Sequence, residues 1–172
     1  SHFKQLHSGQ RADILRYLKQ ENNIQVEILA FCFMDNHFHF LVKQIAKNGI
    51  ATWMGKMQNA YSQYFNKTQK RSGPLLPQFK AVRVQTDEQL VHVSRYIHLN
   101  PSTGYLVSID NLPTYPWSSL SNYIEDSTKF SFVNPSIVLG LMGKKTSYLD
   151  FVLDQAEYQR ALARIKHLLL EE

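Results

Sequence analysis

The first part of the chain changes from helical to strand-like spacing of its apolar residues. Between residues 10 and 21 apolar side chains recur every three or four positions, which predicts a first helix. Residues 24–33 are rich in valine, isoleucine, leucine and phenylalanine, and residues 37–42 mix apolar and polar side chains in alternation. With the turn-forming stretch 34–36 between them, these segments predict two strands joined by a turn.

The next part of the chain predicts a long helix and a further strand. Apolar residues keep a helical period from 50 to 70, and we assign Trp53 and the tyrosines of this segment mostly to the core. Residues 79–84 alternate imperfectly between apolar and basic side chains, which predicts a strand with a basic face.

A capping signal opens the following helix. Thr86 stands three residues before Gln89, with two acidic side chains between them, which is the arrangement of a capping box. Because a proline disfavours helical backbone in the residue before it, we expect this helix to end near Asn100, ahead of Pro101.

The chain beyond residue 101 is less regular. Prolines among polar residues predict an irregular wrap over residues 105–135. Helical spacing returns near Tyr148, and residues 155–170 predict an amphipathic helix packed on the domain or on a partner. The order helix, two strands, helix, strand and helix is typical of an α+β fold, with an antiparallel sheet and helices packed on it.

Composition limits the class of protein. The chain has 172 residues, of which 44% are hydrophobic, enough for one compact domain. Its apolar runs are shorter than the roughly 20 residues of a membrane helix, and no signal peptide is visible, so we expect a cytoplasmic protein without a membrane partner. Cys32 is the single cysteine, which excludes an internal disulfide and indicates a buried thiol.

Basic residues gather in one section of the chain. The formal net charge is only +5, yet residues 36–86 contain no acidic side chain. A surface of solvated lysines is one interpretation, but the length of this stretch favours binding to a polyanion, above all a nucleic acid. Eight basic residues lie in it: Lys43, Lys47, Lys56, Lys67, Lys70, Arg71, Lys80 and Arg83.

Two histidines have the spacing that lets a strand present them together. In His37-Phe38-His39 the side-chain period of two places both imidazoles on one face. The triplet alone is a weak signal for a metal, because exposed or hydrogen-bonded histidines often have the same spacing.

A polar stripe on the predicted helix offers further ligands and a nucleophile. His92, Tyr96 and Asn100 are four residues apart and therefore share one face. Tyr96 and Asn100 can present a phenolic oxygen and a carbonyl oxygen to the same point. The alternative is a half-buried tyrosine followed by an asparagine that caps the helix end.

Two longer motifs contain these residues. Residues 33–42 are Phe-Met-Asp-Asn-His-Phe-His-Phe-Leu-Val, and residues 95–101 are Arg-Tyr-Ile-His-Leu-Asn-Pro. The first resembles the HUH strand and the second the tyrosine motif of the single-tyrosine HUH transposases, specifically the REP-associated tyrosine transposase group. Segments within 71–82, 115–119 and 138–141 also resemble the longer members of that group, so the resemblance covers nearly the whole chain.

The resemblance implies a fold. It predicts a ferredoxin-like antiparallel sheet with helices packed on it, residues 1–104 as the nuclease core and residues 105–172 as a helical C-terminal extension. Family members usually begin with a strand, and no strand-like segment precedes Ser8. The chain also has Asp35 where the family often has proline.

The resemblance also implies a chemistry. It predicts cleavage and rejoining of single-stranded DNA through a 5′-phosphotyrosine intermediate, with Tyr96 as the nucleophile. His37, His39 and Asn100 would hold Mg²⁺ or Mn²⁺. His92, one turn from Tyr96, is a further candidate for activating the phenol, although the family does not require it.

The implied partner is single-stranded or hairpin DNA, bound at the nucleoid, and relatives act as monomers or as homodimers.

Two departures from the family pattern remove positive charge: Pro77-Gln78 replaces a Gly-Arg pair, and residues 102–104 replace Val-Arg-Ala-Gly. Two alternatives are a domesticated hairpin-DNA-binding protein without cleavage activity, and a water-using phosphoesterase in which the tyrosine is structural. The expected DNA-binding residues are Lys56, Lys67, Lys70, Arg71, Lys80 and Arg83.

Overall fold

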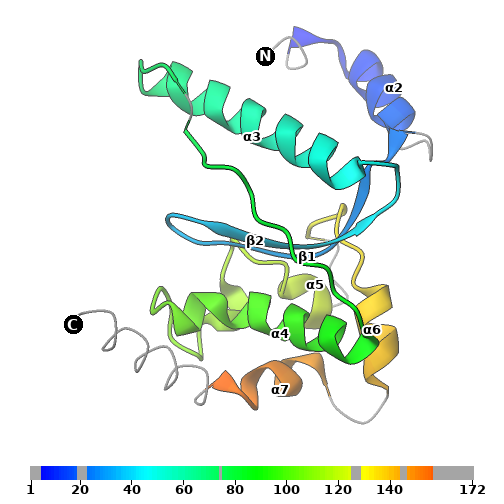
Figure 1. The fold of residues 1–172 in the computed structure, drawn as a ribbon, viewed down its shortest axis with the longest axis vertical. Helices are drawn as coiled ribbons and strands as arrows, with labels where there is room; N and C mark the ends of the chain where they lie inside the picture. The colour runs from blue at the N-terminus through cyan, green and yellow to red at the C-terminus, as the bar shows by residue number, and fades with distance from the viewer. Residues whose placement is uncertain (1–4, 19–22, 74, 125–128, 144–146, 157–172) are drawn as a thin grey trace. The chain divides into compact units, whose positions relative to one another are not determined.

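The structure is a computed structural model, and it describes residues 5–18, 23–73, 75–124, 129–143 and 147–156. It confirms the α+β class, with a two-stranded antiparallel sheet and helices that continue into the C-terminal part of the chain (Figure 1). The elements are α2 (Ser8–Leu18), β1 (Val26–Phe33), β2 (Phe38–Gln44), α3 (Gly49–Thr68), α4 (Asp87–Thr103), the 3-10 helix η2 (Leu112–Thr114), α5 (Ser121–Ile124), α6 (Ser136–Met142) and α7 (Tyr148–Leu153).

The chain divides into two compact units. The first comprises Ser1–Glu27 and Lys43–Ala81, and the second comprises Ile28–Val42 and Val82–Glu172. The expected boundary between a nuclease core and a C-terminal extension, after residue 104, stays a prediction. The second unit carries every residue that the sequence predicts for metal binding and nucleophilic attack.

The hairpin of β1 and β2 forms the sheet and supplies part of the core. The two strands agree with those expected from the sequence to within two residues at each end. The Met34 N–H donates to the His37 carbonyl at 2.8 Å and closes the turn between them. Cys32 is fully buried in β1, as its place in an apolar run predicts.

The irregular segment after α4 covers the outer edge of β1. The Phe33 N–H donates to the Trp117 carbonyl at 2.9 Å, and the Ser119 N–H donates to the Phe31 carbonyl at 3.0 Å. Such pairing satisfies backbone groups that an edge strand would otherwise expose. The predicted wrap over residues 105–135 therefore has a structural role, although η2 and α5 interrupt it with short helical turns.

Helix α4 begins where the sequence predicts and ends later. The Thr86 side chain accepts a hydrogen bond from the Gln89 N–H at 3.1 Å, which confirms the N-cap. The expected end near Asn100 is wrong, because α4 includes Pro101 and runs to Thr103. A proline inside a helix removes one backbone donor and crowds the carbonyl four residues earlier, and here Pro101 lies near the C-terminal end of α4 with its ring fully buried.

Helix α3 belongs to the first unit and confirms the long helix expected there. Its start requires glycine at position 49, because a Cβ atom there would overlap the Gln25 carbonyl. The assignment of its tyrosines to the core is wrong: Tyr61 is 48% exposed and Tyr64 is 69% exposed. Only Gly49 and Met54 are buried among the described residues of this helix.

The strand expected at Phe79–Val84 is absent, since these residues have no regular secondary structure. The apolar side chains there do not keep one parity, so the pattern does not define a single buried face. Val82 is accordingly 88% exposed. Nearby, the Pro77 carbonyl accepts from the Gln58 side chain at 3.1 Å rather than from a neighbouring strand.

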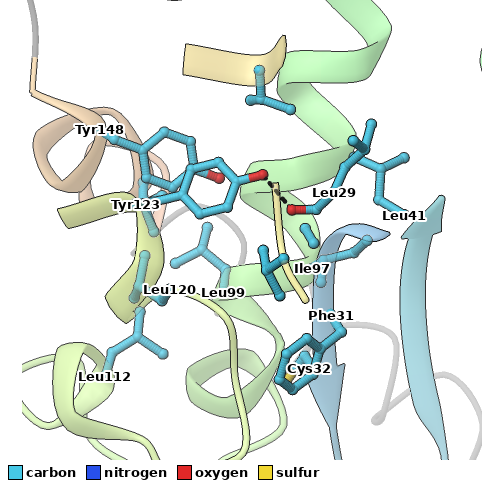
Figure 2. Close-up of a cluster of buried hydrophobic side chains, with 14 of the residues drawn as sticks. Leu29, Phe31, Cys32, Leu41, Ile97, Leu99, Leu112, Leu120, Tyr123 and Tyr148 are labelled. Atoms are coloured by element: carbon cyan, nitrogen blue, oxygen red, sulfur yellow. Dashed lines mark hydrogen bonds between the residues drawn. The ribbon is translucent and has the colours of Figure 1, made fainter. Parts of the chain in front are cut away.

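The core of the second unit lies between the hairpin, α4 and the C-terminal helices (Figure 2). In it Tyr123 donates to the Leu29 carbonyl at 2.7 Å, and its ring lies 4.4 Å from that of Tyr148. Helix α7 confirms the helical spacing near residue 148, whereas α6 has no counterpart among the expected elements. The helix predicted over 155–170 lies almost wholly outside the described residues. No helix in the described part of the chain has both the length and the apolar character of a membrane span.

Burial gives a first testable prediction, on the thiol of Cys32. Burial raises its pKa to about 12, so almost no thiolate exists at pH 8 in the folded protein. We expect a thiol reagent to modify the native protein at least about a hundred times more slowly than the denatured protein, with one equivalent consumed after denaturation. Equal rates in stopped-flow labelling would contradict this burial.

Candidate active site

The two histidines of the HUH-like triplet come together at the start of β2. The ring centroids of His37 and His39 lie 5.0 Å apart, with the planes at 89°. His37 is exposed and His39 is half-buried. The turn and the first residues of β2 thus give a pair of imidazoles, one open to solvent and the other partly desolvated.

Both imidazoles are suited to bind a cation. Desolvation, followed by the nearby charge of His37, lowers the pKa of His39, which favours its neutral form. His37 Nδ1 lies 2.6 Å from Asn36 Oδ1, and with the amide in this orientation Nδ1 carries the hydrogen, because the oxygen can only accept. Nε2 of His37 then keeps its lone pair, as a metal-binding histidine requires.

Helix α4 places Tyr96 beside this pair. The Tyr96 ring lies edge-to-face with the His39 ring, at a centroid separation of 5.8 Å and an interplanar angle of 79°. The tyrosine is 50% exposed, so a substrate in solvent can reach it. The start of β2 and one helix of the same unit therefore bring a nucleophilic side chain next to two imidazoles.

Asn100 follows Tyr96 by one turn on α4 and is 7% exposed. Its amide nitrogen is buried and has no hydrogen-bond partner among the described residues. The two ends of an amide exchange places when the group is flipped, so this unpaired position can equally be an oxygen that faces a cation. A Cβ atom at Gly104 would lie 2.8 Å from the Met34 methyl group, so the C-terminal end of α4 lies against the turn that carries His37.

These donors fit a divalent cation, because two imidazole nitrogens and an unpaired buried amide leave positions open for phosphate and water. The described residues contain no group of three or more histidine, cysteine, aspartate or glutamate side chains arranged for a metal. The assignment of Asn100 as a third ligand beside the two histidines stays a prediction.

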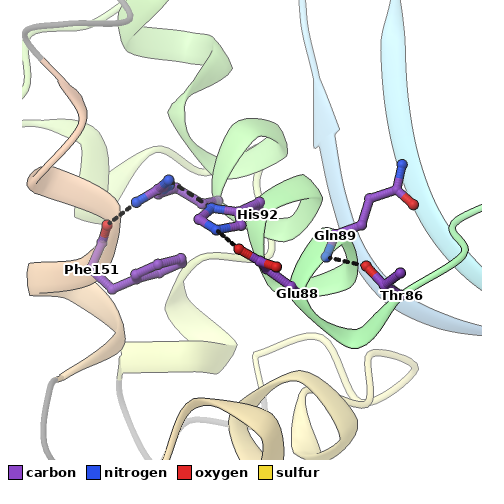
Figure 3. Close-up of polar contacts among 6 residues, drawn as sticks. Thr86, Glu88, Gln89, His92 and Phe151 are labelled. Atoms are coloured by element: carbon purple, nitrogen blue, oxygen red, sulfur yellow. Dashed lines mark hydrogen bonds and ion pairs between the residues drawn. The ribbon is translucent and has the colours of Figure 1, made fainter.

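The His92 ring makes polar contacts with other residues of α4 and none with Tyr96 (Figure 3). Its Nδ1 lies 2.7 Å from the Arg95 guanidinium, which can only donate, so Nδ1 accepts and Nε2 carries the hydrogen. That Nε2 lies 3.9 Å from Glu88, and Arg95 in turn lies over the Phe151 ring at 4.3 Å. The hydrogen bond and the ion pair of His92 thus stay within α4, whereas Arg95 contacts α7, and no lone pair remains on the His92 ring to accept a proton from Tyr96.

The expected DNA-binding residues are all exposed, but they are divided between the units. Arg83 belongs to the second unit, together with the histidine pair and Tyr96. A continuous basic surface that reaches the site stays a prediction. The members in the first unit are Lys56, Lys67, Lys70, Arg71 and Lys80.

Sequence reasoning missed two features of the site. Asn36 orients His37, and its only signal was its place in the turn directly before the histidine. His98 is fully buried within the tyrosine motif, where both of its ring nitrogens have hydrogen-bond partners. Its position between Tyr96 and Asn100 in that motif was the signal that could have drawn attention to it.

Comparison with known proteins identifies the family. A family model described as "Transposase IS200 like" matches residues 3–100, which is more than half of the chain. Neither the curated proteins nor the solved structures contain a match to the chain. The matched segment includes the histidine pair and ends at Asn100, so it contains every residue of the site built above. The chain belongs to the IS200-like transposase family.

Proposed function

We propose that this protein cleaves and rejoins single-stranded DNA through a covalent bond between Tyr96 and a 5′ phosphate. The observation that carries the proposal is the contact of Tyr96 with His39, which in turn lies against His37. A DNA-processing role follows from the family, and this cluster supplies the groups that a phosphoryl transfer needs.

The proposed first step is an attack of the Tyr96 phenolic oxygen on the scissile phosphorus. The new oxygen–phosphorus bond replaces the bond from phosphorus to the 3′ oxygen, the phenol loses its proton, and the 3′ oxygen leaves as a hydroxyl. The phosphotyrosine keeps the energy of the ester, so a second 3′ hydroxyl can attack it and reseal a strand without ATP.

The chain's own residues would bind and orient the reacting groups. His37, His39 and Asn100 would hold Mg²⁺ or Mn²⁺, which, when bound, polarises the phosphate and stabilises charge on the leaving oxygen. Asn36 would keep Nε2 of His37 free of hydrogen, and the neutral state of His39 would avoid competition between proton and cation.

The arrangement supports action by a single chain. Tyr96 and the two histidines belong to one compact unit of the same molecule, so the nucleophile needs no partner subunit to reach the pair. We further place the protein in the REP-associated group, whose tyrosine motif residues 95–101 resemble, with single-stranded DNA that folds into hairpins as its substrate.

Salt dependence tests the expected basic surface. With roughly five phosphate contacts, the logarithm of the single-strand association constant should fall with log salt at a slope of about −3 to −4. The double variant Lys67→Gln/Lys70→Gln should reduce that slope by about 1.4. Arg16→Gln is the control, because Arg16 pairs with Asp13 outside the acid-free stretch and should leave the slope unchanged. A flat response of the unsubstituted protein would exclude this surface.

Cleavage itself is tested with end-labelled oligonucleotides that form hairpins with single-stranded flanks, in the presence of Mg²⁺ or Mn²⁺. We expect cleavage in a single-stranded flank and none of the fully paired duplex. Tight binding without any cleavage would favour the domesticated DNA-binding protein. Cleavage that leaves no protein–DNA adduct would favour a phosphoesterase that uses water.

A further inference from the structure

A chain of buried hydrogen bonds crosses the unit that carries Tyr96. At its centre is His98 of α4, which has no exposed surface. Its Nδ1 lies 2.7 Å from the Tyr148 hydroxyl on α7, and its Nε2 lies 2.8 Å from Ser119 Oγ in the segment that covers β1. One imidazole therefore joins three separate parts of the fold.

This series of hydrogen bonds ends on a backbone group in each direction. The Tyr148 hydroxyl donates to Ser94 Oγ at 2.9 Å, and the Ser94 hydroxyl donates to the Val91 carbonyl at 2.7 Å, both on α4. At the other end the Phe31 N–H of β1 donates to Ser119 Oγ at 2.8 Å. The same oxygen also lies 3.2 Å from the Phe31 carbonyl, a longer alternative for its hydrogen.

One arrangement of hydrogens satisfies every member. Because the Ser94 hydrogen goes to Val91 and the Tyr148 hydrogen goes to Ser94, the Tyr148 oxygen accepts from His98 Nδ1. Nε2 of the same ring, which carries no hydrogen in this tautomer, accepts the Ser119 hydrogen at 2.8 Å. All bonds then run in one direction, and buried bonds in such a series strengthen one another.

Helix α4 connects the buried hydrogen bonds of His98 to the candidate active site. Successive residues differ by about 100° around the axis, so Tyr96 and Asn100 are separated by only about 40°. His98 is about 200° from Tyr96, on the opposite side of α4. The hydrogen bonds of His98, which we call the clamp, therefore lie on one face of α4. The opposite face carries Tyr96 next to the histidine pair.

We propose that His98 is a positioning residue: through Tyr148 and Ser119 it fixes the rotation of α4 and thereby sets where the Tyr96 oxygen lies. The proposal rests on the proposed function of Tyr96 as nucleophile. A displacement of about 1 Å at a reacting atom can cost about 100-fold in rate. Loss of the clamp should therefore slow the chemical step without weakening DNA binding.

The test uses Tyr148→Phe, which removes one hydroxyl and keeps the ring. We expect the single-turnover cleavage rate of the folded protein to fall by about 10- to 100-fold, with the Kd for DNA changed less than about twofold. Tyr123→Phe is the matched control. The Tyr123 ring lies next to that of Tyr148, but its buried hydroxyl donates to the Leu29 carbonyl of β1 instead of taking part in the hydrogen bonds of His98. We expect the control to cleave at the rate of the unsubstituted protein.

A second variant and a second measurement keep the proposal independent of cleavage. Ser119→Ala removes the hydrogen-bond partner of His98 Nε2 and should slow cleavage to a similar extent. It serves as the test if Tyr148→Phe does not fold. In protein labelled with 3-fluorotyrosine at position 96, both variants should shift or broaden the ¹⁹F resonance, while Tyr123→Phe should not.

The outcomes separate this proposal from the proposed function. Unchanged cleavage in a folded Tyr148→Phe variant, or an equal loss in Tyr123→Phe, would overturn the positioning role while Tyr96 chemistry stands. If the unsubstituted protein does not cleave any substrate, the ¹⁹F signal still decides: a resonance that moves only in the clamp variants supports the role, and one that does not move overturns it.

Discussion

Tyr96→Phe is expected to reduce strand cleavage by at least about a thousand-fold, because the substitution deletes the attacking oxygen and nothing else. The ring that lies against His39 stays in place, so the Kd for single-stranded DNA should change less than about twofold. Single-turnover cleavage and fluorescence anisotropy, measured on the same oligonucleotide, give the two quantities.

The control for this variant is another exposed tyrosine. Tyr64→Phe, on the exposed surface of α3, should cleave at the rate of the unsubstituted protein. A Tyr96→Phe protein that cleaves normally would make Tyr96 structural and leave a water-using phosphoesterase as the explanation of any cleavage.

His39→Ala is expected to lose cation binding and cleavage together. Removing a direct ligand should weaken Mn²⁺ affinity by at least about 100-fold, more than the loss of an outer partner of a ligand usually costs. Titration calorimetry with Mn²⁺ alone measures the first effect, and the cleavage rate at saturating Mn²⁺ measures the second.

His92→Ala is the matched control, since it removes an imidazole from α4 that contacts Arg95 and Glu88. We expect unchanged Mn²⁺ affinity and cleavage from it. If His39→Ala binds Mn²⁺ as tightly as the unsubstituted protein, the histidine pair is not the cation site. If His92→Ala alone abolishes cleavage, His92 assists the reaction despite its contacts.

The sequence predicted the features that depend only on residues close together in the chain. The spacing at residues 37–39 indicated that the two imidazoles come together, and their ring centroids lie 5.0 Å apart, although His37 itself precedes β2. The N-cap at Thr86 was equally predictable, since a threonine side chain satisfies helix N–H groups without help from the rest of the fold.

The elements that failed depend on what other parts of the chain do. Pro101 lies inside α4 with its ring buried, and no local rule records that burial. The segment 79–84 has no regular secondary structure, although its residue types allow a strand. In the same way, the partners of His98 lie 21 and 50 residues away in sequence, so no periodicity could connect them.

The most direct test of the central claim is the chemical identity of the bond between protein and DNA. A hairpin oligonucleotide labelled at its 3′ end is incubated with the protein and Mn²⁺, the mixture is denatured, and the protein-bound fraction is digested and analysed by mass spectrometry. We predict an adduct that survives denaturation, requires the divalent ion, and maps to a 5′ phosphate on Tyr96. Cleavage of the oligonucleotide without such an adduct, or with the adduct on another residue, would contradict the account.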